Sequence, residues 1–271
     1  TPDDPFQSLI GWAEDPLVNI TVMALIVLGG LGFFVWSDVW DKHSFCRLRL
    51  HTKIVLTATA GLLLFGFGWT LLFEWSNPAT LGAFDTPHKL LAAAFESVTL
   101  RTAGFNTIVL GALTGPSQAV SCLLMFIGGS PGSTAGGIKT VTAAVLVLTA
   151  ISAFCGRTTV SAFGRTIAPR SIMNAVTLLM AGGVLCLVGA CAIAGIEDAP
   201  FHQCLFEAVS AFGTVGVSMG LTPTLAAASR VILIVMMYMG RVGVLTLGVA
   251  VFMRRREPPR LKYPDADVFI G

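Results

Sequence analysis

The sequence predicts an all-α membrane protein built from a repeated unit, in which a short helix and a loop lie between two apolar spans. Of its 271 residues, 54% are hydrophobic and only 12% are charged, about half the charged fraction of a typical soluble domain. The apolar residues gather in runs long enough to cross a bilayer, and one motif recurs at a fixed distance. The net charge of +2, without a basic tract rich in aromatic residues, argues against nucleic acid as a partner.

Five long apolar runs define the expected spans. They cover residues 17–40, 53–76, 117–154, 171–195 and 226–253. The third run is too long for one straight crossing, and a segment rich in Gly, Ser and Pro interrupts it at residues 128–137. Irregular backbone persists at membrane depth only where it is buried in protein or lines a cavity, because unpaired amide groups are costly there. The interruption is therefore a candidate functional site.

Two further apolar runs, at 88–100 and 201–212, are too short to span and are predicted to be re-entrant helices. Each leads into a Thr-x-Gly loop, Thr102–Gly104 in the first copy and Thr214–Gly216 in the second. The same offset of 112 residues aligns Gly128 with Gly240, Thr134 with Thr246 and Gly136 with Gly248, whereas the Phe-Glu pairs at 95–96 and 206–207 are out of register by one. Duplicated units around an axis are a common way to build a central pathway through a membrane.

The distribution of Lys and Arg predicts the orientation. Basic residues concentrate in the connections 38–53 and 155–170 and in the tail after residue 253, so these segments are expected on the cytoplasmic side. Lys89, Arg101 and Arg230 are the basic residues expected opposite. The outer side is also expected to carry six acidic residues, whose field would raise the local cation concentration, with a merely solvated face as the alternative: Glu74, Asp85, Glu96, Glu197, Asp198 and Glu207.

The duplicated Thr-x-Gly loops suggest a site for a dehydrated cation. Backbone carbonyls replace the hydration shell of K⁺ in the Thr-Val-Gly-Tyr-Gly filters of potassium channels, and glycine tolerates the dihedral angles that this requires. Two such loops at equivalent points of a repeat favour this interpretation over ordinary extracellular turns. The predicted fold is then a set of span–pore-helix–filter-loop–span units around a central ion pathway. The candidate selectivity-filter residues are Thr102, Ala103, Gly104, Thr214, Val215 and Gly216.

Five stretches together resemble the Trk/Ktr/HKT superfamily of potassium transporters, most closely its KtrB-type membrane subunit. They are GGLGF at 29–33, RTAGFNT at 101–107, IGGSPGSTAGGIKT at 127–140, FEAVSAFGTVGVS at 206–218 and GRVG at 240–243. The superfamily has four repeats around one pore, so the resemblance implies a C-terminal fragment. Residues 1–52 would hold the second span of an upstream repeat and a cytoplasmic connection, 53–170 a third repeat with a broken second span, and 171–271 a fourth repeat with a cytoplasmic tail.

The resemblance also implies roles for the interrupted span and for one arginine. Translocation of K⁺, with Na⁺ as a second candidate ion, would be gated by an intramembrane loop. The gating residues would be Gly128, Gly129, Ser130, Pro131, Gly132, Ser133, Thr134, Ala135, Gly136 and Gly137, and Arg241 would form a barrier in the pore. The residues alone point the same way for Arg241, because a charge in mid-span needs a cavity or a partner. An arginine that merely ties helices together is the alternative.

The partners implied by the resemblance are a second full-length subunit, forming a homodimer, and a cytosolic nucleotide-binding ring of the KtrA/TrkA type. The expected location is the bacterial inner (plasma) membrane, with several spans and a cytoplasmic C-terminus. No cofactor, and no metal beyond the transported ion, is expected on this chain. A structural or transport-defective membrane fragment remains the alternative function.

An enzyme is not expected. A membrane hydrolase would need a nucleophile paired with a base, or a metal cluster at depth, and the four histidines have no such partner in the sequence pattern. The glycine-rich stretch at 132–140 superficially resembles a phosphate-binding loop. However, it lacks the glycine directly before Lys-Thr, and no strand precedes it, so nucleotide binding by this chain is not expected.

Overall fold

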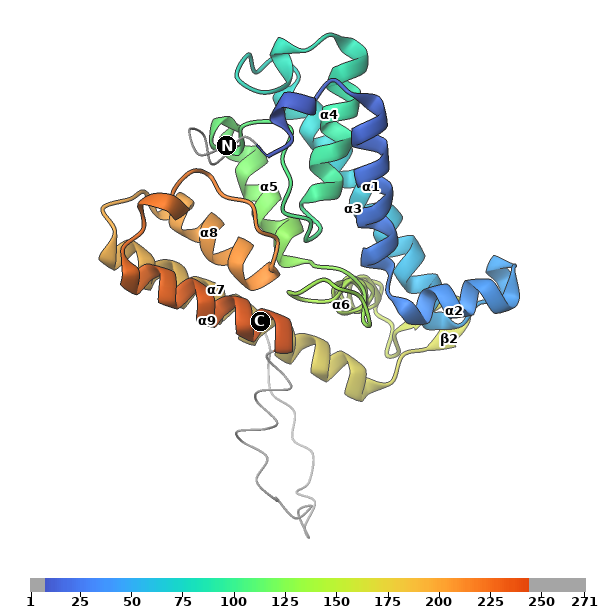
Figure 1. Cartoon of the computed structure of the whole chain (residues 1–271). Helices are drawn as coiled ribbons and strands as arrows, with labels where there is room; N and C mark the ends of the chain where they lie inside the picture. Colours follow the sequence, from blue (N-terminus) through green and yellow to red (C-terminus); the bar gives the residue numbers. More distant parts are fainter. Residues whose placement is uncertain (1–7, 244–271) are drawn as a thin grey trace.

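Two helical units meet along a shared interface in the computed structural model, which describes residues 8–243 (Figure 1). The helices are α1 (Pro16–Leu31), α2 (Phe33–Lys42), α3 (Leu50–Glu74), α4 (Thr86–Thr99), α5 (Gly115–Phe126), α6 (Thr140–Phe154), α7 (Pro169–Ile196), α8 (Phe201–Gly213) and α9 (Ala227–Val242). Single-turn 3-10 helices lie at Ile10–Trp12, Phe45–Arg47, Leu81–Ala83, Leu110–Ala112 and Thr222–Thr224. The unit α3–α6 and the unit α7–α9 correspond to the two copies of the repeat, and α1 and α2 precede them.

The first apolar run, 17–40, is not one straight crossing as predicted. Asp15 begins α1 by accepting hydrogen bonds from the amides of Leu17 and Val18 at 2.9 and 3.2 Å, and α1 ends at Leu31. Gly32 then has a φ of +85°, a conformation that favours glycine, and α2 departs at 91° to α1. The run therefore forms two helices that turn sharply at one glycine.

Two helices of the described part are long and apolar enough to cross a bilayer. They are α3, with 25 residues, and α7, with 28 residues, and the bent pair α1–α2 would add a third crossing. The run 117–154 is divided into α5 and α6 by the irregular segment, as predicted, and α4 and α8 are the expected short helices. The last run is described only as far as α9, because Thr246, Gly248 and the basic tail lie outside the described residues.

The core lies where the short helices meet the longer ones. Phe95 of α4 and Phe206 of α8 are fully buried at equivalent points of the repeat. The rings of Phe126, at the end of α5, and Phe212 of α8 have centroids 5.6 Å apart. Contacts of α8 with α5 therefore join the second unit to the first, while α7 and α9 pack against α8 within the second unit.

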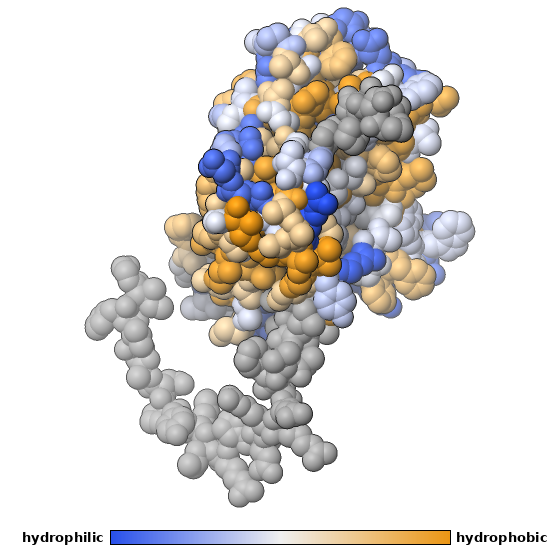
Figure 2. All heavy atoms as spheres, turned by 60° about the vertical axis from the view of Figure 1, so that its left-hand side comes forward, coloured by the Kyte–Doolittle hydropathy of each residue, from blue (hydrophilic) through white to orange (hydrophobic). Residues whose placement is uncertain are grey.

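Much of the molecular surface is apolar. Figure 2 shows broad hydrophobic areas on the face that it presents. Large side chains such as Leu72, Phe154 and Ile234 are 62–92% exposed. Apolar patches of this extent are typical of surfaces that contact lipid or neighbouring membrane segments. Together with the spanning helices, they identify a membrane protein.

A two-stranded hairpin that the sequence pattern did not indicate connects α6 to α7. In it β1 (Ser161–Ala162) pairs antiparallel with β2 (Arg165–Thr166). The ring of Phe163 at its turn lies edge-on to Phe45, with centroids 6.1 Å apart, and the ammonium of Lys53 lies 5.8 and 5.9 Å from the two ring centroids. The hairpin thus contacts the 38–53 connection, which was expected on the same side as the 155–170 connection.

Candidate functional site: two Thr-x-Gly loops and an intramembrane loop

The two Thr-x-Gly loops approach each other backbone to backbone. A Cβ atom placed on Gly104 would lie 2.9 Å from the carbonyl oxygen of Val215, and one placed on Gly216 would lie 3.4 Å from the Cα of Gly104. The structure therefore brings together the loops that the repeat predicted, although 112 residues separate their threonines. A side chain at Gly104 would force the loops apart.

The two loops also have the same backbone shape. Thr102 and Thr214 have φ angles of +69° and +53°, and Gly104 and Gly216 have φ angles of +83° and +87°. Positive φ is uncommon for a β-branched residue such as threonine, so its appearance in both copies marks a shared geometry. Alternating conformations of this kind turn successive carbonyls in directions that a regular helix or strand does not allow.

A hydroxyl group from each short helix fixes an equivalent carbonyl just beyond each glycine. Thr99 of α4 donates to the carbonyl of Phe105, and Ser210 of α8 donates to the carbonyl of Val217 at 2.6 Å. These hydroxyls were missed by the sequence analysis. The signal was present, because Thr99 and Ser210 share the 111-residue offset of the Phe-Glu pairs, one less than the offset of the loops.

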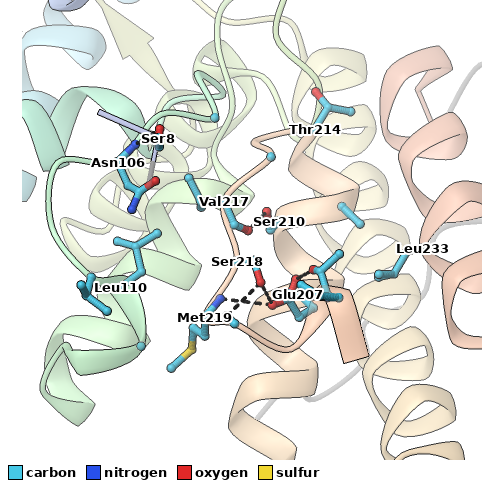
Figure 3. Close-up of a pocket in the computed structure, with 18 of the residues that line it drawn as sticks. Ser8, Asn106, Leu110, Glu207, Ser210, Thr214, Val217, Ser218, Met219 and Leu233 are labelled. Carbon is cyan, nitrogen blue, oxygen red and sulfur yellow. Dashed lines mark hydrogen bonds between the residues drawn. The ribbon is translucent and has the colours of Figure 1, made fainter. Parts of the chain in front are cut away.

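Glu207 of α8 stabilises the segment that follows the second loop (Figure 3). Its carboxylate accepts hydrogen bonds from the hydroxyl of Ser218 at 2.5 Å, the amide of Met219 at 3.1 Å and the hydroxyl of Thr222 at 2.6 Å. With only 3% of its surface exposed, Glu207 acts on the loop rather than on ions in solution.

Glu74, at the end of α3, is a second buried carboxylate. It accepts hydrogen bonds from the amide and hydroxyl of Thr114 at 2.9 and 2.7 Å, and from Thr80 and Asn77 at 2.7 Å. Glu96 is also buried, with 1% exposed. Three of the six acidic residues that were expected to form an outer charged surface are therefore internal, and their position corrects that expectation.

A cavity of about 750 Å³ opens beside the two loops (Figure 3). Gly104 and Asn106 from the first loop region and Thr214, Gly216 and Ser218 from the second line it. Its lining includes no residue of 128–137. The loops thus separate an open cavity from the irregular segment.

The segment 128–137, here called the intramembrane loop, is closed at its base. Ile127 and Ile138 form a bridge in which the amide of Gly128 donates to the carbonyl of Ile138 at 2.8 Å, and the amide of Ile138 donates to Phe126 at 3.1 Å. Within the loop, the hydroxyl of Ser133 donates to the carbonyl of Ser130 at 2.6 Å. The interruption of the span is therefore a defined loop whose ends meet.

The intramembrane loop contacts both Thr-x-Gly loops. A Cβ placed on Gly128 would lie 3.6 Å from the methyl group of Thr102, and one on Gly136 would overlap the side chain of Thr214. The loop also bonds to the α1–α2 bend, where the amide of Ser130 donates to Gly30 at 3.0 Å. All ten predicted gating residues therefore lie in one segment that contacts both predicted filter loops.

Two cationic side chains donate to carbonyls of the intramembrane loop. Arg241, an exposed residue near the end of α9, donates to the carbonyl of Thr134. Lys139 donates to the carbonyl of Ala135. Arg241 thus has a polar partner in the broken segment. Among the residues that the structure describes, no group of three or more His, Cys, Asp and Glu side chains is arranged to hold a metal ion.

Comparison with known proteins places this geometry in a family. A family model described as TrkH, cation transport protein, matches residues 5–257. The Ktr system potassium uptake protein B of Bacillus subtilis is 39% identical over 265 residues, which cover 98% of this chain and 59% of that protein. The potassium/sodium uptake protein NtpJ of Enterococcus hirae is 38% identical over 270 residues, covering 98% and 60%. The chain thus spans about three fifths of the length of these relatives.

The fold has a counterpart among solved structures. The crystal structure of the potassium transporter TrkH from Vibrio parahaemolyticus superimposes with a TM-score of 0.68 at 17% sequence identity, over 87% of this chain and 52% of that one. At this identity the likeness concerns the fold alone, and the family model and the relatives supply the family. This chain belongs to the TrkH family of cation transport proteins.

Proposed function

We propose that the protein translocates K⁺ across the plasma membrane through a selectivity filter of backbone carbonyls. The observation that carries the proposal is the pair of loops with matching φ angles that meet backbone to backbone, since ordered carbonyls are how a protein replaces the hydration shell of K⁺. Relatives named as potassium and potassium/sodium uptake proteins support it. Na⁺ is accordingly a second candidate ion.

The roles follow the geometry. Thr102–Gly104 and Thr214–Gly216 supply two walls of the filter, and the remaining walls come from repeats outside this sequence. The intramembrane loop at 128–137 is the gate, because it contacts both filter loops. Arg241 holds the gate through the carbonyl of Thr134 and repels cations that pass the filter.

The proposed organisation has the three regions that were predicted from the sequence. Residues 1–52 carry the second span of an upstream repeat, 53–170 a third repeat and 171–271 a fourth repeat with a cytoplasmic tail. The hairpin that joins the 155–170 and 38–53 connections supports their location on one side, which their basic residues make the cytoplasmic side. The complete subunit would form a homodimer and bind a cytosolic nucleotide-binding ring; relatives named as a protein of a Ktr system support the assignment of partner subunits.

Transport is favoured over a structural role and over catalysis. A purely structural membrane fragment would not need two loops of matching strained geometry or a span broken at the contact between them. Catalysis would need reactive groups placed together, and the described carboxylates Glu74 and Glu207 are occupied by hydrogen bonds within the protein.

The first test is K⁺ uptake by the complete protein in cells that lack their own K⁺ uptake systems, with and without Gly216→Ser. Gly216 has a φ of +87°, which a serine adopts only with strain, so the variant should lose most of its uptake or its discrimination between K⁺ and Na⁺. A serine variant that transports like the wild type would remove Gly216 from the filter. A wild type that is well expressed with its cytosolic partner and takes up no K⁺ would favour the structural alternative.

The second test concerns the gate. Arg241→Ala removes the donor to Thr134, and deletion of 132–136 removes the part of the loop that lies against Thr214. Both changes should raise K⁺ flux severalfold, because each removes a barrier while leaving the filter residues in place. Flux is measured as ⁸⁶Rb⁺ uptake into proteoliposomes. Normal flux through a folded deletion variant would show that the loop is not the gate.

A further inference from the structure

Arg101 occupies an unexpected position. It was expected on the outer side of the membrane without a stated partner, and it is buried, with only 7% of it exposed. It lies between the end of α4 and Thr102, and its guanidinium extends toward two backbone carbonyls. Nη2 lies 3.4 Å from the carbonyl oxygen of Gly128, and Nη1 lies 3.5 Å from that of Thr59 in the middle of α3.

The burial of this charge requires a reason. Within residues 8–243, the ion pairs are those of Asp38 with Lys42 and Arg49, and that of His88 with Asp85. None involves Arg101. A guanidinium buried without a carboxylate is costly, and carbonyl groups offset only part of the cost. An apolar side chain would fill this space at a lower free-energy cost, so packing alone does not explain the arginine. The positions of its two carbonyl partners indicate its role.

Those partners belong to two different elements. Gly128 is the first residue of the intramembrane loop and lies beside the methyl group of Thr102. Thr59 belongs to α3, one of the two helices long enough to cross a bilayer. Arg101 itself directly precedes the filter threonine in the chain. One side chain therefore connects the base of a filter loop, the start of the intramembrane loop and a spanning helix.

The second repeat lacks this connection. The residue directly before its filter threonine is Gly213, and the counterpart of Gly128 is Gly240. Gly240 lies so close to Phe212 that a Cβ would overlap the Phe212 carbonyl, and α9 continues past this point as a helix to Val242. The arginine is thus present in the repeat whose helix α5 ends before Gly128, and backbone contact takes its place in the repeat whose helix α9 extends past Gly240.

We propose that Arg101 is a positioning residue that anchors the start of the gate to the filter loop Thr102–Gly104, so that gate movement and filter geometry are coupled. The inference rests on the proposed function of the two loops. On this proposal, two arginines hold different parts of the gate. Arg241, which is exposed, holds the far part of the gate at Thr134 and is free to release it. Arg101, which is buried, keeps the Gly128 end in place.

The planar fork of arginine is what allows one side chain to serve two carbonyls. Lysine would keep the charge but present a single ammonium group, which reaches one carbonyl well and leaves the other. Methionine would fill similar space without charge or donors. The series Arg101, Arg101→Lys and Arg101→Met therefore removes the connection in two steps.

The experiment uses the complete protein in proteoliposomes and two measurements. The first is the ratio of K⁺ to Na⁺ uptake. The second is the rate at which a thiol reagent modifies Ser133→Cys in the gate, quantified by mass spectrometry of the peptide so that the six native cysteines do not interfere. For Arg101→Met we expect the uptake ratio to fall about tenfold, the size expected from losing a hydrogen bond to a charged group, and residue 133 to react severalfold faster. For Arg101→Lys, both the uptake ratio and the rate at residue 133 should lie between the values of the wild type and of Arg101→Met.

Arg230→Met is the matched control, because Arg230 is an exposed arginine of α9 that donates to Pro223 at 3.0 Å and contacts neither loop. It should leave both measurements unchanged. Wild-type values of both quantities in a folded Arg101→Met variant would overturn the proposal. If Arg101→Met gives no monodisperse protein, Arg101→Lys decides, and wild-type values there would equally overturn it.

The two measurements distinguish a failure of this proposal from a failure of the proposed function. A wild type without K⁺ uptake would remove the transport assignment. The reactivity of residue 133 would still report whether Arg101 holds the loop, because that measurement needs no ion flux. A changed uptake ratio with unchanged reactivity at residue 133 would place Arg101 in the filter alone and overturn its coupling to the gate.

Discussion

The two repeats share their loops and differ in what supports them. In both, the threonine and the glycine of the Thr-x-Gly loop have positive φ angles, and a helix hydroxyl fixes the next carbonyl. In the second repeat, α9 passes directly beneath its loop with Gly240 against Phe212. In the first, the chain leaves α5 after Phe126 and forms the intramembrane loop before α6 begins.

This difference teaches where the fold tolerates change. The backbone geometry at the meeting of the loops is the same in both copies, whereas the helices beside them differ: α5 ends two residues before Gly128, and α9 ends two residues after Gly240. A transporter needs an invariant ion site and a movable barrier. The proposed function assigns these two properties to different segments, the ion site to the two Thr-x-Gly loops and the barrier to the intramembrane loop.

The largest expected effect tests the close contact between α9 and α8. In Gly240→Ala the new methyl group would overlap the backbone of α8, and neither helix can yield easily. Overpacking typically costs about 1–3 kcal/mol and occasionally more. Because this Cβ would overlap the backbone carbonyl oxygen of Phe212, we expect a cost of about 3 kcal/mol or more and a fall in melting temperature of about 6 °C or more, measured on the detergent-solubilised protein.

Gly128→Ala is the matched change in the broken repeat. Its methyl group would overlap the carbonyl of Gly136, but that carbonyl belongs to a loop that can shift. The melting temperature should change by less than about 2 °C, while K⁺ flux changes. Equal destabilisation by the two variants would mean that the intramembrane loop is as rigid as α9.

An intermediate effect is expected from Glu207, and little effect from Glu96, which is also buried. Glu207 accepts hydrogen bonds from Ser218, Met219 and Thr222, and Glu207→Gln should cost about 1.5–3 kcal/mol because hydrogen bonds to a charged acceptor are lost. In the described part of the chain the carboxylate oxygens of Glu96 have no hydrogen-bond partner. Glu96→Gln should therefore leave the melting temperature nearly unchanged or raise it. The opposite ranking of the two variants would show that Glu96 has a partner outside residues 8–243.

The smallest effects are expected from removing one hydroxyl in each repeat, and the two effects should be of equal size. Ser210→Ala and Thr99→Val each remove one hydroxyl that holds the carbonyl after a filter glycine. A neutral hydrogen bond contributes about 1 kcal/mol, so each variant should reduce the K⁺/Na⁺ uptake ratio by less than about fivefold. Effects that differ by more than that between the variants would show that the two loops do not contribute alike.

The repeated features of the molecule were predictable from the sequence. The 112-residue offset placed both Thr-x-Gly loops and the broken span, and the structure brings them into contact. The short helices and the all-α membrane fold are confirmed as well. The roles of these loops as filter and gate stay predictions.

Features that depend on side-chain direction were not predictable. The distribution of Lys and Arg placed Glu74 and Arg101 on the outer side of the membrane, but it does not indicate which neighbours a polar side chain contacts or whether it is buried. The bend at Gly32 was missed because an apolar run reports length and not backbone angle. The one-residue shift of the Phe-Glu pairs was visible, but its meaning became clear only when the hydroxyls of Thr99 and Ser210 were seen to share it.

The placement of Arg101 and Gly213 at equivalent points of one chain has a genetic consequence. In an assembly of four identical subunits, a single codon change alters all four copies of a loop at once. Here each loop has its own codons, so a lineage can place an arginine beside one loop while its counterpart keeps a glycine. Selection can thus change the two loops independently, one substitution at a time.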